Sequence, residues 1–107
     1  MNLVKNQYGH FDIIDNLGNL QGATDMGNYY VVSNDRIYDM YQTAWGWIIR
    51  VGEENPRIGA FRWKYMSKAY RGKYDFVTDY TYAKAIKDKA RAKAHLANIV
   101  RADGYKI

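Results

Sequence analysis

The sequence predicts an α+β fold, in which a small antiparallel sheet of three or more strands packs against one long C-terminal helix. Residues 45–77 alternate aromatic or aliphatic side chains with cations, and a period of two is typical of strands. Short breaks divide this stretch into three segments, and turns of hairpin length favour antiparallel order. Residues 79–103 then contain no Gly or Pro and carry apolar residues at helical spacing.

Residues 1–44 form an acidic part rich in Gly and Asn. The residues Asn16–Asn19 predict a turn between two short strands. Tyr29–Val32 has the composition of a strand, and the turn-forming residues that follow it can begin a helix. Because apolar residues then recur at helical spacing, we expect a short helix from Asp35 to Thr43.

The basic, aromatic part from 45 to 77 divides its side chains by parity. In the first segment Trp45, Trp47, Ile49 and Val51 share one parity, whereas Arg50 has the other. In the second segment Phe61, Trp63 and Tyr65 share one parity, and Arg62 and Lys64 have the other. In the third segment Tyr70, Tyr74 and Phe76 share one parity, and Arg71 and Lys73 have the other. We therefore expect one face of rings, buried under the helix, and one face of cations exposed to solvent.

The predicted helix spans residues 79–103, with Asp79 as a capping residue and Gly104 as the stop signal. Its apolar stripe is rich in alanine, which allows a helix to approach a sheet closely. The stripe consists of Tyr82, Ala83, Ile86, Ala90, Ala97 and Val100.

Length and composition predict a single domain over residues 1–107. The chain has no cysteine, which excludes disulfides and thiolate metal sites. It has no signal-like N-terminus, and no apolar run approaches the ~18 residues of a membrane span. We expect a cytoplasmic protein with no membrane partner, no metal and no cofactor.

Positive charge is concentrated in the second half of the chain. Residues 1–49 carry two basic and five acidic groups, a net charge of −3, whereas residues 50–107 carry fourteen basic and six acidic groups, a net charge of +8. From Asn55 to Tyr74 there is no acid at all. Such a single-sign surface attracts a polyanion, and nucleic acid is the commonest one.

The sequence therefore predicts a non-enzymatic nucleic-acid-binding domain that contacts phosphates of DNA or RNA through a basic sheet face. The expected phosphate contacts are Arg50, Arg57, Arg62, Lys64, Lys68, Arg71 and Lys73. A secondary basic face on the helix would consist of Lys84, Lys87 and Arg91. Charged positions on strands and helices are also common as plain solvated surface, which is the simpler interpretation of both sets.

Two other classes of function remain open. The first is a small protein-binding inhibitor or adaptor, of the type that phages and mobile elements encode, which would bind an acidic protein surface or a nucleic-acid-processing complex through Tyr and Trp anchors. The second is an enzyme that uses His10, Asp12 and Asp15, which requires these residues to gather in one cleft. No spacing typical of a phosphate-binding loop or a nucleophile motif supports catalysis.

Overall fold

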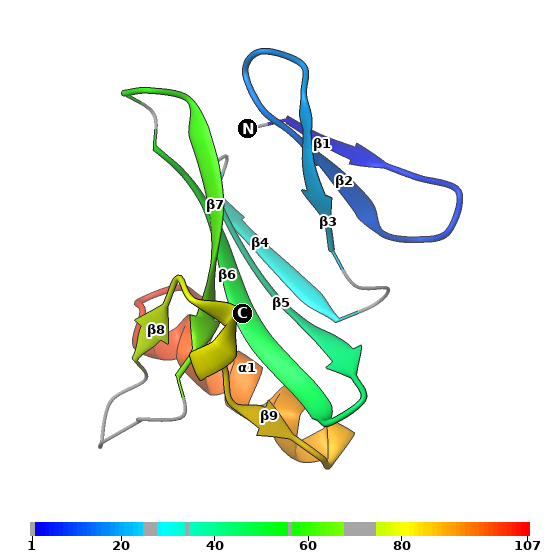
Figure 1. The fold of residues 1–107 in the computed structure, drawn as a ribbon, viewed down its shortest axis with the longest axis vertical. Helices are drawn as coiled ribbons and strands as arrows, with labels where there is room; N and C mark the ends of the chain where they lie inside the picture. The colour runs from blue at the N-terminus through cyan, green and yellow to red at the C-terminus, as the bar shows by residue number, and fades with distance from the viewer. Residues whose placement is uncertain (1, 25–27, 34, 56, 68–74) are drawn as a thin grey trace.

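The computed structural model describes residues 2–24, 28–33, 35–55, 57–67 and 75–107. Within these ranges the chain forms two antiparallel sheets and one C-terminal α-helix (Figure 1). The α+β class is therefore confirmed, although the main sheet has six strands and is larger than the expected one. Across the same ranges, no helix has the length and apolar character needed to span a bilayer.

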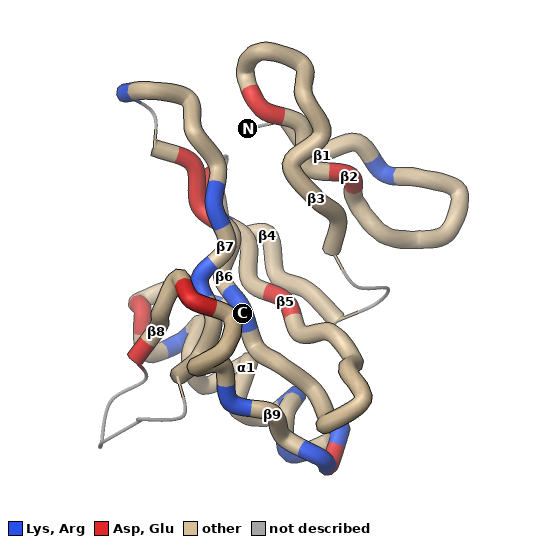
Figure 2. Tube along the Cα trace, viewed as in Figure 1, with Lys and Arg blue, Asp and Glu red and all other residues tan. Residues whose placement is uncertain are grey.

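The first sheet consists of three consecutive antiparallel strands: β1 (Asn2–Lys5), β2 (Phe11–Ile14) and β3 (Leu20–Ala23). The predicted turn at residues 16–19 is confirmed. Asp15 holds this turn, because its carboxylate accepts hydrogen bonds from the backbone nitrogens of Leu17 and Asn19, both at 2.9 Å. Figure 2 shows that acidic residues mark this sheet, where Asp12 and Asp15 lie.

The main sheet has the order β4-β5-β6-β7-β8, and the short strand β9 pairs with β6. Its strands are β4 (Tyr29–Ser33), β5 (Arg36–Thr43), β6 (Gly46–Asn55), β7 (Ala60–Met66), β8 (Phe76–Val77) and β9 (Ala85–Ile86). The predicted strand at Tyr29–Val32 is confirmed. Because β6 pairs with β5, β7 and β9, this ten-residue strand is the centre of the sheet.

The predicted short helix at Asp35–Thr43 is wrong, because this segment forms β5. Four consecutive residues from Ile37 to Met40 are buried, so the strand is covered on both faces. A strand covered on both faces loses the polar-apolar alternation by which strands are recognised in a sequence. The helical spacing of its apolar residues was therefore uninformative.

The C-terminal helix α1 (Lys89–Ala102) is ten residues shorter at its start than the predicted helix 79–103. Asp79 does cap a helical turn, but that turn is the single 3₁₀ turn η1 (Tyr80–Tyr82). The chain then forms β9, and Asp88 caps α1 through a hydrogen bond from the backbone nitrogen of Arg91. The stop at Gly104 is confirmed, since its φ of +93° suits glycine.

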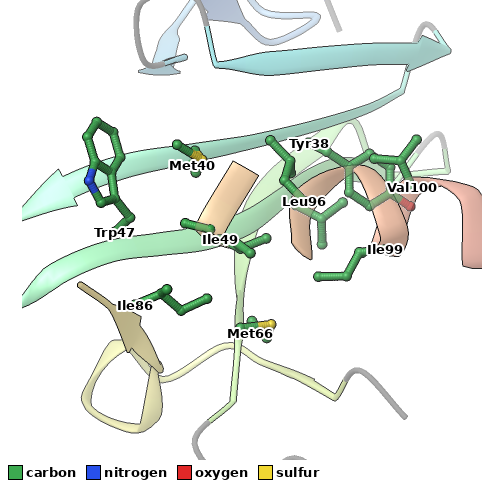
Figure 3. Packing of buried hydrophobic residues seen from close by; sticks show 11 residues of the cluster. Tyr38, Met40, Trp47, Ile49, Met66, Ile86, Leu96, Ile99 and Val100 are labelled. Atoms are coloured by element: carbon green, nitrogen blue, oxygen red, sulfur yellow. The ribbon is translucent and has the colours of Figure 1, made fainter. Parts of the chain in front are cut away.

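The hydrophobic core lies between α1 and one face of the main sheet (Figure 3). As predicted, Trp47, Ile49 and Val51 of β6 belong to it. The prediction was wrong for Trp45, which lies in the turn before β6 and is 71% exposed. The helix contributes Ala92, Leu96, Ile99 and Val100, which follow helical spacing from residue 92 onward. The predicted stripe was partly wrong, because its first three members precede α1 and Ala90 is exposed.

The prediction that Phe61, Trp63 and Tyr65 lie under the helix is wrong. The register pairs Tyr65 with Arg50 and Trp63 with Gly52, on the sheet face opposite to the core. Gly52 leaves room for the rings, because a Cβ there would come within 2.6 Å of the Phe61 ring and 2.9 Å of the Trp63 ring. The aromatic residues of β7 therefore form a second layer on the other side of the sheet.

Arg50 organises this second layer. Its Nε and Nη2 atoms bind the Asp39 carboxylate at 2.7 and 3.0 Å, and Asp39 is fully buried. The guanidinium lies 3.6 Å from the Trp63 ring centre and 4.5 Å from that of Tyr41. Nη2 also donates to the carbonyl of Ala23 in β3 at 2.8 Å, so Arg50 joins the first sheet to the main sheet.

We expect Arg50→Met to destabilise the fold by about 3–5 kcal/mol, because it leaves the buried Asp39 carboxylate without its cation. Arg36→Met is the matched control, since it breaks the Arg36–Glu53 ion pair (2.8 Å), which is more open to solvent. That control should cost no more than about 1 kcal/mol. Urea unfolding of both variants measures the difference, and equal losses would contradict a structural role for Arg50.

Candidate functional site

The cations of the predicted sheet face do not share one face. The side chains of two residues that are paired across neighbouring strands lie on the same side of the sheet. Arg50 is paired with Tyr65. Lys64 is paired with Val51, and Arg62 with Glu53. Arg50 is therefore on the second-layer face, and Arg62 and Lys64 are on the face that carries the core. The alternation within each strand was predicted correctly. The register between β6 and β7, however, places the aromatic residues of β7 on the face away from the core and its cations on the core face.

The burial of Arg50 also argues against its predicted phosphate contact. Its side chain is only 14% exposed, and its guanidinium already binds Asp39 and the Ala23 carbonyl. A phosphate would have to displace these groups.

Arg62 and Lys64 lie beside an acid. Glu53 forms ion pairs with Arg36 and with Lys64, and it is the cross-strand neighbour of Arg62. This carboxylate offsets part of the positive charge of the group. Arg57 is exposed in the connection between β6 and β7, while Lys68, Arg71 and Lys73 lie outside the described residues.

The secondary basic set, by contrast, is brought together by the structure. Lys84, Lys87 and Arg91 line one pocket of about 310 Å³ between β9 and the first turn of α1. We call these three residues the basic corner. In one continuous helix, Lys84 and Arg91 would be ~10 Å apart along the axis. In the structure the chain turns between β9 and α1, and all three residues line the same pocket.

The local sequence explains this turn. Asp88 accepts a hydrogen bond from the backbone nitrogen of Arg91 at 3.1 Å and so begins α1 immediately after β9. β9 itself is held against β6 by pairing of Ile86 with Trp47 and of Ala85 with Ile48. The basic corner is thus attached to the central strand of the sheet.

His95 lies in the same pocket and was not singled out as part of a site from the sequence. Burial lowers the pKa of its imidazole, and the positive charges of Arg91 and Lys84 lower that pKa further. This shift means that the pocket disfavours one more positive charge. The signal that would have found His95 is its position four residues after Arg91, which places both on one helix face.

Charge in this region is strongly one-sided. Residues 84–101 hold six cations and one acid, Asp88, for a net charge of +5. Figure 2 shows the cations gathered around β9 and the start of α1. Because the carboxylate of Asp88 already caps the helix, the region is suited to attract an anion.

The enzymatic alternative requires His10, Asp12 and Asp15 to act together. No three His, Asp or Glu side chains of the described ranges are placed to hold a metal ion together. Asp15 serves its turn and also accepts a hydrogen bond from Gln21 at 2.9 Å. Asp12 accepts a longer one from Asn6 at 3.4 Å. These carboxylates therefore act within the first sheet.

Comparisons of the chain with protein-family models, with curated proteins and with solved structures give no match. The function proposed below therefore depends on the geometry and charge of the described residues.

We expect the double variant Lys84→Gln with Arg91→Gln to raise the pKa of His95, because both cations repel the protonated imidazole. The pKa should remain below its ordinary value, since burial is the larger cause. Titration of the His95 ring signal by NMR measures the change. Arg101→Gln, at the far end of α1, is the control and should leave the pKa unaltered. An unchanged pKa in the double variant would show that the basic corner does not act on His95.

Proposed function

We propose that the protein binds nucleic acid through the basic corner, as a binding module rather than an enzyme. The observation that carries this proposal is the convergence of Lys84, Lys87 and Arg91 on one pocket. His95 lies in the same pocket, and its pKa is lowered first by burial and further by the charges of Arg91 and Lys84. Lysine and arginine side chains so placed are suited to contact the phosphates of DNA or RNA.

Neighbouring cations support a contact that extends beyond the pocket. Lys89 and Lys93 are exposed on α1, and Lys89 Nζ lies 5.0 Å from the centre of the Trp47 ring. Lys93 lies on another side of the helix, where it lines a pocket with Tyr29 and Tyr30. A nucleic-acid chain carries a phosphate at every nucleotide and can follow cations around a surface, so cations spread over β9 and α1 match it better than they match a single small anion. We therefore favour a polymeric anion as the ligand.

A protein partner is the second candidate function, and a separate observation favours it. The first sheet exposes large apolar side chains at Val4, Tyr8, Leu17 and Leu20, the last two 85% and 65% exposed. All four belong to the three-stranded first sheet or its turns, and exposed apolar patches mark many interaction surfaces. An inhibitor or adaptor would use this end of the molecule. A stoichiometric protein partner that survives nuclease treatment and is lost with Leu17→Ser plus Leu20→Ser would favour this candidate.

We expect the triple variant Lys84→Gln, Lys87→Gln and Arg91→Gln to weaken binding of labelled DNA and RNA oligonucleotides and to flatten the salt dependence. Each lost phosphate contact lowers the slope of log K against log salt by about 0.9 for duplex DNA and about 0.7 for single strands. Fluorescence anisotropy across a salt series measures both quantities.

The matched control is the triple variant Arg36→Gln, Arg62→Gln and Lys64→Gln, which changes the net charge equally at the site around Glu53. We expect it to retain most of the affinity and the slope. Equal losses of affinity in the two triple variants would show that binding depends on the net charge of the protein and not on the basic corner. Absence of binding by the unmodified protein even at low salt would refute the proposed function.

A further inference from the structure

A second pocket adjoins the basic corner on the other face of β9. It has a volume of about 390 Å³ and is lined by Trp45, Ile48, Tyr80, Thr81, Ala83 and Ala85. We call it the Trp45 pocket. Ile48 has the opposite parity to the core residues of β6, so the pocket lies on the sheet face away from α1.

The walls of the Trp45 pocket are aromatic and its base is apolar. Trp45 is 71% exposed and Tyr80 is 42% exposed, whereas Ile48 and Ala83 are nearly fully buried. Two large rings that remain open to solvent over an apolar base form a surface suited to a flat ligand, because burying such a side chain contributes about 1.5–3 kcal/mol. Their exposure is explained if a flat apolar ligand covers them.

The pocket is held in shape by contacts on both sides. The Tyr80 ring packs edge-on against Tyr65, with ring centres 5.4 Å apart. Asp79 fixes the backbone of Thr81 through a 2.9 Å hydrogen bond. The pocket therefore needs little rearrangement to accept a ligand.

The opposite wall is set by the turn between β5 and β6. The backbone nitrogen of Trp45 donates to Oγ1 of Thr43 at 3.2 Å, and this hydroxyl donates to the carbonyl of Gly46 at 2.7 Å. Gly46 has a φ of +133°, and a Cβ there would come within 2.7 Å of the Ile86 carbonyl oxygen. Only glycine allows β9 to approach this turn so closely, which brings the Trp45 pocket next to the basic corner.

One residue connects the two pockets. Ala85 of the two-residue strand β9 lines both the Trp45 pocket and the pocket of the basic corner. An apolar, aromatic pocket and a cationic pocket are thus separated by the width of one strand. A nucleotide has the same pair of chemical characters, since a flat base is joined through its sugar to a charged phosphate.

We infer that the Trp45 pocket receives an unpaired base of a single-stranded nucleic acid whose phosphates lie on the basic corner. This inference rests on the proposed function and adds the substrate class to it. In a duplex the faces of the bases are stacked on one another, so an aromatic pocket accepts a base at least cost from a single strand or an unstacked end. The cationic neighbour favours this occupant over an apolar side chain of a protein.

The test compares three probes: an oligodeoxythymidylate of about 15 nucleotides, within the usual range of site sizes, a duplex of equal length, and inorganic polyphosphate. We expect Trp45→Ala to weaken single-strand binding on the order of tenfold, and to leave duplex and polyphosphate binding unchanged. Trp45→Phe should restore most of the single-strand affinity, because a phenyl ring also stacks. An oligouridylate in parallel extends the comparison to RNA.

Tyr82→Ala is the matched control, since Tyr82 is an exposed aromatic residue near Tyr80 that does not line the pocket. Circular dichroism confirms that each variant is folded. Equal single-strand affinity of Trp45→Ala and Tyr82→Ala, with binding itself intact, would overturn the inference and leave the proposed function standing. An equal loss of duplex binding in Trp45→Ala would also overturn it. Failure of the unmodified protein to bind any of the three probes would overturn both.

Discussion

The buried ion pair of Arg50 with Asp39 is the interaction on which the arrangement of the molecule depends. Taking both charges out of water is costly, and the cost is offset by two-point contact with the carboxylate and by the Trp63 and Tyr41 rings that enclose the guanidinium. Through the Ala23 carbonyl the same side chain reaches the first sheet. The main sheet is consequently covered on both sides, by α1 on one face and by aromatic rings and β3 on the other. Among the residues that the structure describes, the predicted cations are divided between the two faces, and the proposed contact with nucleic acid moves to the end of the sheet where β9 meets α1.

The sequence predicts well which side chains within one strand share a face, and it predicts poorly which residues of neighbouring strands lie opposite one another. Alternation correctly placed Trp47, Ile49 and Val51 under the helix, because all three lie on one strand. It failed for Trp63, because which residue of β7 lies opposite Gly52 depends on the hairpin connection and on the room that Gly52 leaves. A shift of one residue in register moves every side chain of a strand to the other face.

The same distinction between local and long-range information applies to helices and to the site. Asp79 and Asp88 are equally good capping residues, and only pairing of β9 with β6 makes the second one the start of α1. The cations of the basic corner were visible in the sequence because they are close together in the chain. The pocket they share with His95, and the Trp45 pocket behind it, were not visible. Both depend on contact between β9 and the turn at Gly46, residues about 40 positions apart in the chain.

The distribution of charge along the molecule has a kinetic consequence. Asp12 and Asp15 lie in the first sheet, and the basic corner lies near the opposite end of a molecule whose longest dimension is 36 Å (Figure 2). Under the proposed function, a polyanion would attract the cationic end and repel the acidic end before the two surfaces touch. The molecule would approach with its cationic end leading, so fewer collisions would be wasted in wrong orientations. Rotational alignment of this kind acts on the rate of encounter, and it leaves the lifetime of the complex to the short-range contacts around β9.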